Sequence, residues 1–195
     1  MILKGYHGTS KSIAGIICQE QRFKESIGDK QWLGHGAYFF KDDAIQAFIW
    51  GKYHNSLAPN DVGVVKVDIN ANHTLNIDLT ITEHRDMVNR IFKLLVDEGK
   101  NKSEKATIYT KIEELLNSKT PCDGYVLDSI YKLNPYDLAI GAYPIPKQSG
   151  LSCFRHKPMH IQICVKNETC ICFETLEELS HDEYRRIREA MHQKN

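Results

Sequence analysis

The chain has 195 residues, of which 42% are hydrophobic and 26% are charged. These values are ordinary for a globular protein that buries one core, so residues 1–195 are expected to form a single domain. Lys plus Arg and Asp plus Glu number 25 each, so the formal net charge is zero. No global field therefore favours non-specific binding to nucleic acid or to an acidic membrane.

The sequence predicts a cytoplasmic protein. Residues 1–5 lack the charged and apolar regions of a signal peptide. No apolar run approaches the roughly 20 residues that span a bilayer, so we expect no membrane partner. Without a secretory signal, we expect reduced thiols rather than disulfides. The six cysteines are Cys18, Cys122, Cys153, Cys164, Cys170 and Cys172.

In the first third of the chain, short apolar runs alternate with helical patterns. Strands are expected over residues 2–6, 37–40 and 62–69. Ser10 is suited to cap a helix that carries Ile13, Ile16 and Ile17, and Asp42 or Asp43 starts a second helix that runs through Trp50.

The middle of the chain shows helical periodicity. Apolar residues recur at helical spacing over 82–98 and again over 102–119, with a turn expected at 99–103. These two helices form a helical insert at about 80–120.

The last third returns to strands. They are expected over 124–127, 138–143 and 160–165, with 171–173 as a hairpin partner and a final helix over 176–191. In the strand at 160–165, His160, Gln162 and Cys164 share one face. The fold class is therefore α+β, with strands from both ends of the chain and helices between them.

Two short motifs carry the functional signal. They are Tyr6-His7-Gly8-Thr9 and Gly34-His35-Gly36-Ala37-Tyr38-Phe39. Together with Gln162 on a late strand, their order and spacing resemble the ADP-ribosyltransferase superfamily. The likeness is to its His-Tyr-Glu branch, which includes the poly(ADP-ribose) polymerases and diphtheria-type toxins. The resemblance implies a split β-sheet core with flanking helices, and NAD as co-substrate.

The resemblance also implies roles for single residues. His7 would hydrogen-bond a ribose hydroxyl on the adenosine side, and the backbone of Gly8, beside Thr9, would pair with the nicotinamide amide. Tyr38 would stack on the nicotinamide ring. Trp50, or less favourably Tyr53, would supply a second aromatic face.

The third site residue departs from the family pattern. Gln162 stands where the branch often has Glu, which stabilises the positive charge that develops on the ribose as nicotinamide leaves. Glutamine can hydrogen-bond the ribose, but it carries no charge and cannot act as a base. Glu168 or Glu174 are alternatives, although each lies beyond the expected strand position.

The sequence also contains residues whose spacing would suit other chemistries. Cys153, His156, His160 and Cys164 have spacings that a zinc site can use, but Pro158 and the strand pattern disfavour it, so no metal is expected. Hydrolase and phosphate-loop signatures are absent from the sequence. His7, Tyr38, Gln162 and Trp50 also have purely structural interpretations, as strand or core residues.

The sequence therefore predicts a mono-ADP-ribosyltransferase that uses NAD to modify a protein or nucleic acid. By resemblance it would serve as a bacterial or phage-linked toxin or defence effector, with an antitoxin or immunity protein as partner. One alternative is a non-catalytic module that binds ADP-ribose, NAD or a partner protein on the same fold. Another is an NAD-dependent RNA 2′-phosphotransferase, for which Arg155 and Lys157 are the nearest basic pair.

Overall fold

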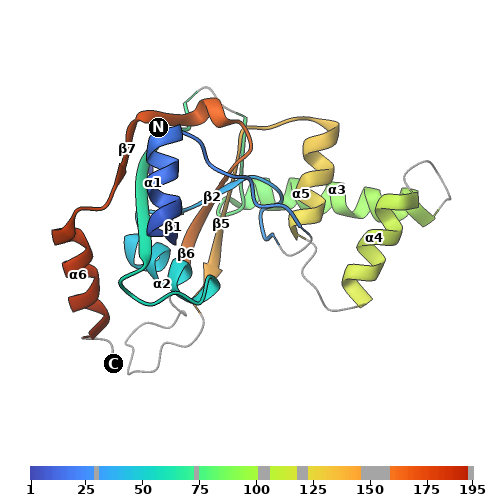
Figure 1. The fold of residues 1–195 in the computed structure, drawn as a ribbon. Coiled ribbons are helices and arrows are strands. Elements are labelled where there is room, and N and C mark those ends of the chain that lie inside the picture. The colour runs from blue at the N-terminus through green and yellow to red at the C-terminus, as the bar shows by residue number, and fades with distance from the viewer. Residues whose placement is uncertain (29–30, 73–74, 101–105, 118–122, 146–158, 193–195) are drawn as a thin grey trace.

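The computed structural model describes residues 1–28, 31–72, 75–100, 106–117, 123–145 and 159–192. Within these residues, seven strands form one mixed sheet and six α-helices flank it (Figure 1). The strand order is β4-β5-β6-β2-β1-β3-β7. Only β4 and β5 are parallel neighbours, and the other pairs are antiparallel. The expected mixture of strands and helices is confirmed.

The elements of the N-terminal third follow the predicted order. They are β1 (Ile2–Ser10), α1 (Lys11–Glu20), β2 (Ala37–Lys41), α2 (Ala44–His54) and β3 (Val62–Asn70). The predicted caps are confirmed: the Ser10 hydroxyl accepts a hydrogen bond from the Ile13 N–H, and the Asp43 carboxylate accepts one from the Gln46 N–H. Each cap satisfies a backbone donor that the first helical turn leaves unpaired.

The middle of the chain is more helical than the sequence pattern indicated. It contains β4 (Asn76–Asp78), α3 (Thr82–Lys100), α4 (Ala106–Asn117) and α5 (Asp123–Leu133). The strand predicted at 124–127 is wrong, because this segment is the first turn of α5. Val126, Leu127 and Ile130 are buried at helical spacing, and this periodicity outweighs the local strand preference. The turn predicted at 99–103 lies partly outside the described residues, and α3 continues through 99–100.

The C-terminal third corrects two further predictions. It comprises β5 (Leu138–Pro144), β6 (Met159–Val165), a 3₁₀ turn (Glu168–Cys170), β7 (Ile171–Glu178) and α6 (His181–His192). β7 pairs with β3 rather than with β6, so the predicted hairpin is wrong. The last helix begins at His181 rather than at 176. There the Glu183 carboxylate accepts from the Ser180 N–H and the Ser180 hydroxyl accepts from the Glu183 N–H, which is a capping box.

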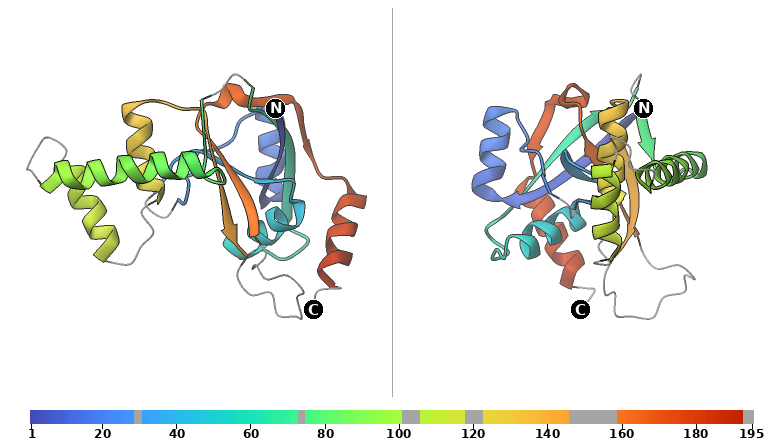
Figure 2. Two further views of the ribbon diagram at one scale, coloured as in Figure 1. Left: turned by 180° about the vertical axis from the view of Figure 1, so that it is seen from behind. Right: turned by 90° about the vertical axis from the view of Figure 1, so that its right-hand side faces the viewer.

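The helices cover the two faces of the sheet unequally. α1 packs on one face with Phe23 and Phe39, while α3 and α5 lie on the opposite side of the strands (Figure 2). α2 and α6 cover the β1 and β3 portion of that second face. α3 and α4 extend away from the sheet, so the insert forms a distinct projection (Figure 1).

The sheet opens at its centre. β1 pairs with β3 along its whole length, but it pairs with β2 only through Gly5↔Lys41 and Tyr6↔Phe40. Beyond Tyr6 the two central strands separate. The described strands form one continuous sheet with an opening at one end of the β1–β2 pair, and not two separate sheets.

Candidate functional site

A pocket of about 170 Å³ lies where β1 and β2 separate. Ligand pockets for drug-sized molecules are typically about 300–1,000 Å³, so this one fits a single ring of a larger ligand. It is lined by His7, Gly8, Ser26, Gln31, Trp32, Tyr38, Phe39, Phe40, Trp50, His54 and Gln162.

The structure brings together five of the six site residues that the sequence suggested, namely His7, Gly8, Tyr38, Trp50 and Gln162. Thr9 is the exception: it is buried on β1 opposite Gly63 and is not among the residues that line the pocket. Tyr53, the weaker substitute for Trp50, is exposed and does not line the pocket either.

The imidazole of His7 bridges the two separating strands. Its Nδ1 lies 2.8 Å from the backbone oxygen of Tyr38, and since a carbonyl only accepts, Nδ1 carries the proton. Burial lowers the pKa of His7, while the bond to the Tyr38 carbonyl opposes this change. His7 is therefore neutral at pH 7, and its Nε2 lone pair is able to accept a hydrogen bond from a hydroxyl.

The backbone of Gly8 faces the opening. The N–H and C=O groups of a strand point alternately to its two neighbours. Lys4 directs its carbonyl toward the β2 side, where it accepts from the Asp42 N–H at 2.9 Å. Gly8 lies an even number of residues after Lys4 on the same strand, so its N–H and C=O point to the β2 side as well. The β1–β2 ladder ends at Tyr6, so the N–H and C=O of Gly8 have no partner on β2. This donor and acceptor can pair with the C=O and NH₂ of a primary amide.

Gly8 also has a packing role. A Cβ at this position would overlap the backbone oxygen of Ala47 on α2. A Cβ on Gly51 would in turn lie 3.0 Å from the Gly8 carbonyl carbon. The two glycines let the helix approach the strand closely, and this approach brings Trp50 and His54 of α2 to the pocket.

The ring of Tyr38 is held in one orientation. Its hydroxyl donates to the Gly34 carbonyl oxygen at 2.7 Å and accepts from the Leu33 N–H at 2.9 Å. Burial raises the pKa of Tyr38 far above its ordinary value, so the hydroxyl stays protonated. Gly34 has a φ of +79°, which permits the turn that presents its carbonyl to Tyr38.

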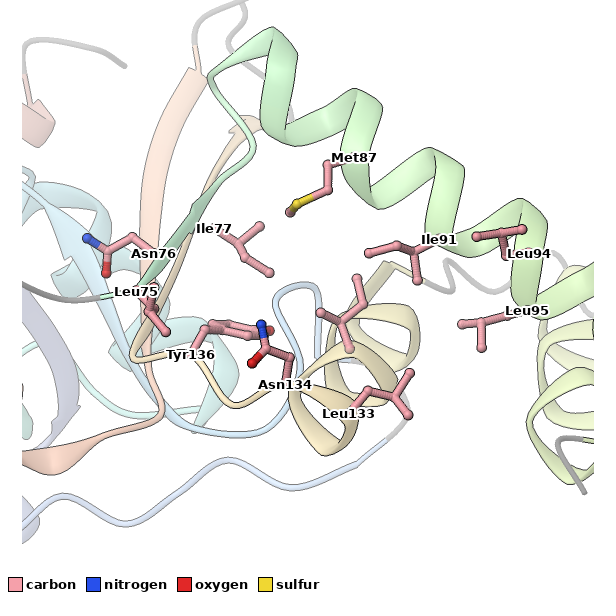
Figure 3. A pocket seen from close by; sticks show the side chains of 11 residues that line it. Leu75, Asn76, Ile77, Met87, Ile91, Leu94, Leu95, Leu133, Asn134 and Tyr136 are labelled. Atoms are coloured by element: carbon pink, nitrogen blue, oxygen red, sulfur yellow. The ribbon is translucent and has the colours of Figure 1, made fainter.

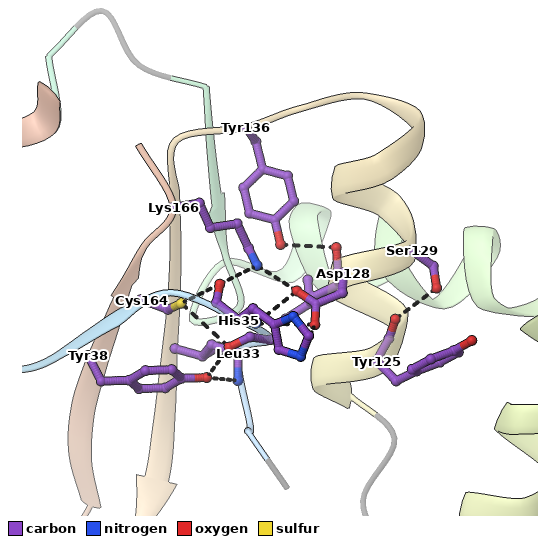
Figure 4. Close-up of polar contacts among 11 residues, drawn as sticks. Leu33, His35, Tyr38, Tyr125, Asp128, Ser129, Tyr136, Cys164 and Lys166 are labelled. Carbon is purple, nitrogen blue, oxygen red and sulfur yellow. Dashed lines mark hydrogen bonds and ion pairs between the residues drawn. The ribbon is translucent and has the colours of Figure 1, made fainter. Parts of the chain in front are cut away.

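A buried ion pair anchors the turn that precedes β2 (Figure 4). Asp128 of α5 accepts from the His35 N–H at 2.9 Å and pairs with the Lys166 ammonium at 2.7 Å. Lys166 also donates to the His35 carbonyl oxygen at 2.8 Å, and its side chain is only 3% exposed. Helix α5 thus holds the turn on which Tyr38 depends.

Gln162 is buried on β6, directly opposite Phe40 of β2. Its side-chain nitrogen lies 2.9 Å from Nε2 of His160. Within the described residues, the pocket lining contains no Asp or Glu. Glu168 and Glu174 are exposed on the 3₁₀ turn and on β7, so neither supplies the third site residue.

Sequence reasoning missed several aromatic residues around the pocket. The Trp32 ring lies 4.4 Å from Tyr143 and 6.3 Å from His160 between centroids, and His54 stacks on Trp50 at 4.8 Å. The available signal was a tryptophan inside a polar segment between two glycines, where no helix or strand pattern requires a large aromatic side chain.

The zinc alternative lies partly outside the described residues. Cys153 and His156 lie outside the described residues, as do Arg155 and Lys157. Within the described chain, no group of three or more His, Cys, Asp or Glu side chains is arranged to hold a metal ion. Burial raises the pKa of the Cys164 thiol to about 12, and its sulfur contacts the His35 carbonyl oxygen at 3.5 Å.

A larger hollow of about 410 Å³ lies between β4, α3 and α5 (Figure 3). Its lining is almost entirely apolar, and Tyr136 is its single ionisable side chain among the described residues. The smaller pocket is the candidate site, because polar and aromatic side chains converge there. No helix in the described part of the chain has the length and apolar character needed to cross a membrane.

A comparison with known proteins finds a distant relative. The chain is 26% identical over 190 residues to the uncharacterized protein MJ0359 of Methanocaldococcus jannaschii, an alignment that covers 85% of this chain and 83% of that protein. No family model matches the sequence. No solved structure matches it either.

Proposed function

We propose that this protein binds NAD at the opening between β1 and β2 and transfers its ADP-ribose, as a single unit, to a macromolecular acceptor. The observation that carries the proposal is the convergence of three groups in one pocket. They are the backbone edge of Gly8, the fixed ring of Tyr38 and the Nε2 lone pair of His7. Gly8 would pair with the nicotinamide amide, Tyr38 would stack on the ring, and His7 would accept from a ribose hydroxyl.

The lining of the pocket fits the nicotinamide end of NAD. Nicotinamide in NAD is a flat cationic ring, and aromatic faces attract cations. No Lys or Arg lines the pocket in the described chain, so no positive charge opposes such a ring. The volume admits one ring, which leaves the adenosine end and the acceptor outside the pocket. Trp50 lines the pocket and is 46% exposed.

Gln162 determines the kind of transfer that we propose. NAD supplies an activated glycosidic bond, and positive charge develops on the ribose as nicotinamide leaves. Gln162 would hold a ribose hydroxyl, but it neither balances that charge nor accepts a proton. Since chain elongation needs an activated ribose hydroxyl, the product is a single ADP-ribose. The acceptor is then intrinsically nucleophilic or is activated by another group.

The acceptor class and the biological role rest on the resemblance alone. We propose a protein side chain or a nucleic acid base as acceptor, and a cytoplasmic toxin or defence effector as the role. An antitoxin or immunity protein would be the matching partner. The zero net charge favours local contacts to the acceptor over a large electrostatic footprint.

The absence of a carboxylate from the described lining also favours a second function, a module that binds NAD or ADP-ribose without turnover. The RNA 2′-phosphotransferase alternative has less support. An acceptor phosphate calls for basic side chains, and no Lys or Arg lines the pocket in the described residues.

The deciding experiment follows both halves of NAD. The purified protein is incubated with a cell lysate and NAD that is labelled separately on nicotinamide and on the adenylate phosphate. Transferase activity releases nicotinamide and places adenylate label in protein, RNA or DNA. Calorimetric binding of NAD or of ADP-ribose without nicotinamide release identifies the binding module, and an absence of binding to both ligands refutes both proposals.

Matched variants locate the activity in the pocket. Gln162→Ala should strongly reduce release, and mass spectrometry of the acceptor should show one ADP-ribose at each site. Gln19→Ala, a change of the same kind at an exposed position on α1, should leave release unchanged. Full activity in Gln162→Ala, or polymeric product, would contradict the assignment of Gln162.

A further inference from the structure

His160 and Gln162 lie two residues apart on β6, so their side chains stand on the same face. The Gln162 amide nitrogen lies 2.9 Å from Nε2 of His160, and both side chains are buried. An amide nitrogen donates but does not accept. With the amide nitrogen as the donor, Nε2 of His160 is the unprotonated acceptor and the imidazole carries its proton on Nδ1.

The surroundings of His160 support this neutral tautomer. Burial lowers the pKa of His160, and the Asp43 carboxylate opposes this effect. Among the described residues, Tyr143 also faces the imidazole, and burial raises the pKa of Tyr143 well above its ordinary value. A buried imidazole without a paired carboxylate stays neutral near pH 7.

Aromatic rings hold the imidazole in place. The Trp32 ring stacks on it with the two centroids 6.3 Å apart and the planes 14° apart. The Phe40 ring meets it edge-on with the centroids 5.1 Å apart. Its Nδ1 atom is buried without a hydrogen-bond partner among the described residues. An unpaired buried N–H costs stability, and a phenylalanine would fill the same space without that cost. Packing alone therefore does not account for a histidine at this position.

We infer that His160 is a positioning residue that turns the Gln162 amide so that its carbonyl oxygen faces the pocket, where it accepts a hydrogen bond from a sugar hydroxyl. One amide N–H is held by His160, and the side chain still lines the pocket. The oxygen is the acceptor that remains. The orientation is inferred from the contact between the Gln162 amide nitrogen and Nε2 of His160, whereas the sugar hydroxyl rests on the proposed function.

The orientation is tested without any substrate. Long-range ¹H–¹⁵N NMR of the NAD-free protein near pH 7.5 reports which imidazole nitrogen of each histidine carries hydrogen. The His160 signals are assigned by their loss in His160→Phe or His160→Gln. We expect Nδ1 of His160 to be protonated and Nε2 to be bare. A protonated Nε2 would mean that the Gln162 oxygen faces His160, which would overturn the inference.

The function of the orientation is tested by two variants and nicotinamide release from NAD. His160→Phe preserves the aromatic volume and removes the acceptor, so kcat should fall by about tenfold, the usual effect of one orienting hydrogen bond, with a smaller change in KM. His160→Gln returns an acceptor oxygen near the position of Nε2 and should recover most of that loss.

The outcomes separate the inference from the proposed function. Equal loss in both variants, or full activity in His160→Phe, would reduce His160 to a packing residue and overturn its positioning role. A wild-type protein that neither binds NAD nor releases nicotinamide would overturn the proposed function, and with it the sugar hydroxyl as the group bound. The NMR result would still decide the orientation of Gln162.

Discussion

Nδ1 of His7 donates a hydrogen bond to the backbone oxygen of Tyr38 at the point where the β1–β2 ladder ends. If the β1–β2 register continued, Gly8 would lie opposite Tyr38, and the Gly8 N–H would donate a hydrogen bond to the Tyr38 carbonyl. The imidazole takes the carbonyl instead. The Tyr38 carbonyl on β2 is thereby hydrogen-bonded, while the backbone N–H and C=O of Gly8 stay available for a ligand. The side chain of His7 thus maintains the opening in the sheet.

The two nitrogens of His7 should be separable by mutation. In His7→Asn the amide N–H can replace Nδ1 and keep the bond to Tyr38, while the acceptor at Nε2 is lost. We expect weaker NAD binding by about 1–3 kcal/mol, the cost of an unmet buried hydrogen bond, with a small change in thermal stability. Calorimetry and thermal melting measure the two effects. His7→Phe, which loses both nitrogens, should lower binding and stability together, and unchanged NAD affinity in His7→Asn would remove Nε2 from the site.

Tyr38 should show different effects of its hydroxyl and its ring. Tyr38→Phe leaves the Leu33 N–H and the Gly34 carbonyl without their partner, so the free energy of unfolding should fall by about 1–3 kcal/mol. The ring remains able to stack, so NAD turnover should fall much less than in Tyr38→Ala. Urea unfolding and nicotinamide release are the measurements. Equal turnover in Tyr38→Ala and the wild type would make this ring a core aromatic only.

Gly8 should be intolerant of any side chain. In Gly8→Ala the new methyl group meets the Ala47 backbone oxygen, so α2 must shift and the variant should lose about 1–3 kcal/mol of stability or more. Gly15→Ala is the matched control, because nothing lies within 4 Å of its added methyl group and it sits inside α1. That control should gain about 0.5–1 kcal/mol. Denaturant unfolding compares them, and equal stability of the two variants would exclude the close contact.

The Asp128–Lys166 pair should be strongly coupled. Asp128→Asn leaves a buried ammonium without a counter-ion, so the free energy of unfolding should fall by about 3–5 kcal/mol. Lys166→Met in the same chain removes that ammonium, and the double variant should recover a large part of the loss. A double-mutant cycle by urea unfolding measures the coupling. Additive single losses would show that the pair does not anchor the turn before β2.

The free energy of unfolding should depend on pH through the carboxylate of Glu183. Its hydrogen bond to Lys66, assisted by the Ser180 N–H, lowers the pKa of Glu183 to about 2 from an ordinary 4.5. A carboxyl with a lowered folded-state pKa stabilises the protein above the unfolded-state value and loses this contribution as the pH falls from about 4.5 toward 2. Glu183→Gln should therefore be less stable than the wild type at pH 7, and the difference should shrink at pH 3.

The control for this prediction lies on the same helix. Glu189 pairs with Arg185 at 4.0 Å on an exposed surface, and such pairs contribute little. Glu189→Gln should therefore match the wild type at both pH values. Urea unfolding at each pH makes the comparison, and a difference for Glu183→Gln that persists unchanged at pH 3 would exclude the ion pair as its cause.

Residues near one another in the chain determined much of the fold by themselves. The caps at Ser10 and Asp43, the strand over 37–40 and the two helices of the insert were readable, because caps and hydrophobic periods act within a few residues. The order of the two motifs likewise predicted which residues meet, and Gly8, Tyr38 and Gln162 do line one pocket.

Tertiary structure decided the features that depend on residues far apart in the chain. The segment at 124–127 became helical because Val126 and Leu127 find a core there, and β7 joined β3 instead of its neighbour in the chain. A strand's own residues show which face is buried, but they do not name the strand that pairs with it. Asp128 reaches the His35 N–H across 93 residues, and Trp32 contacts His160, which lies still farther away along the chain. Such contacts form only when the whole chain buries its apolar surface at once, and they complete the pocket.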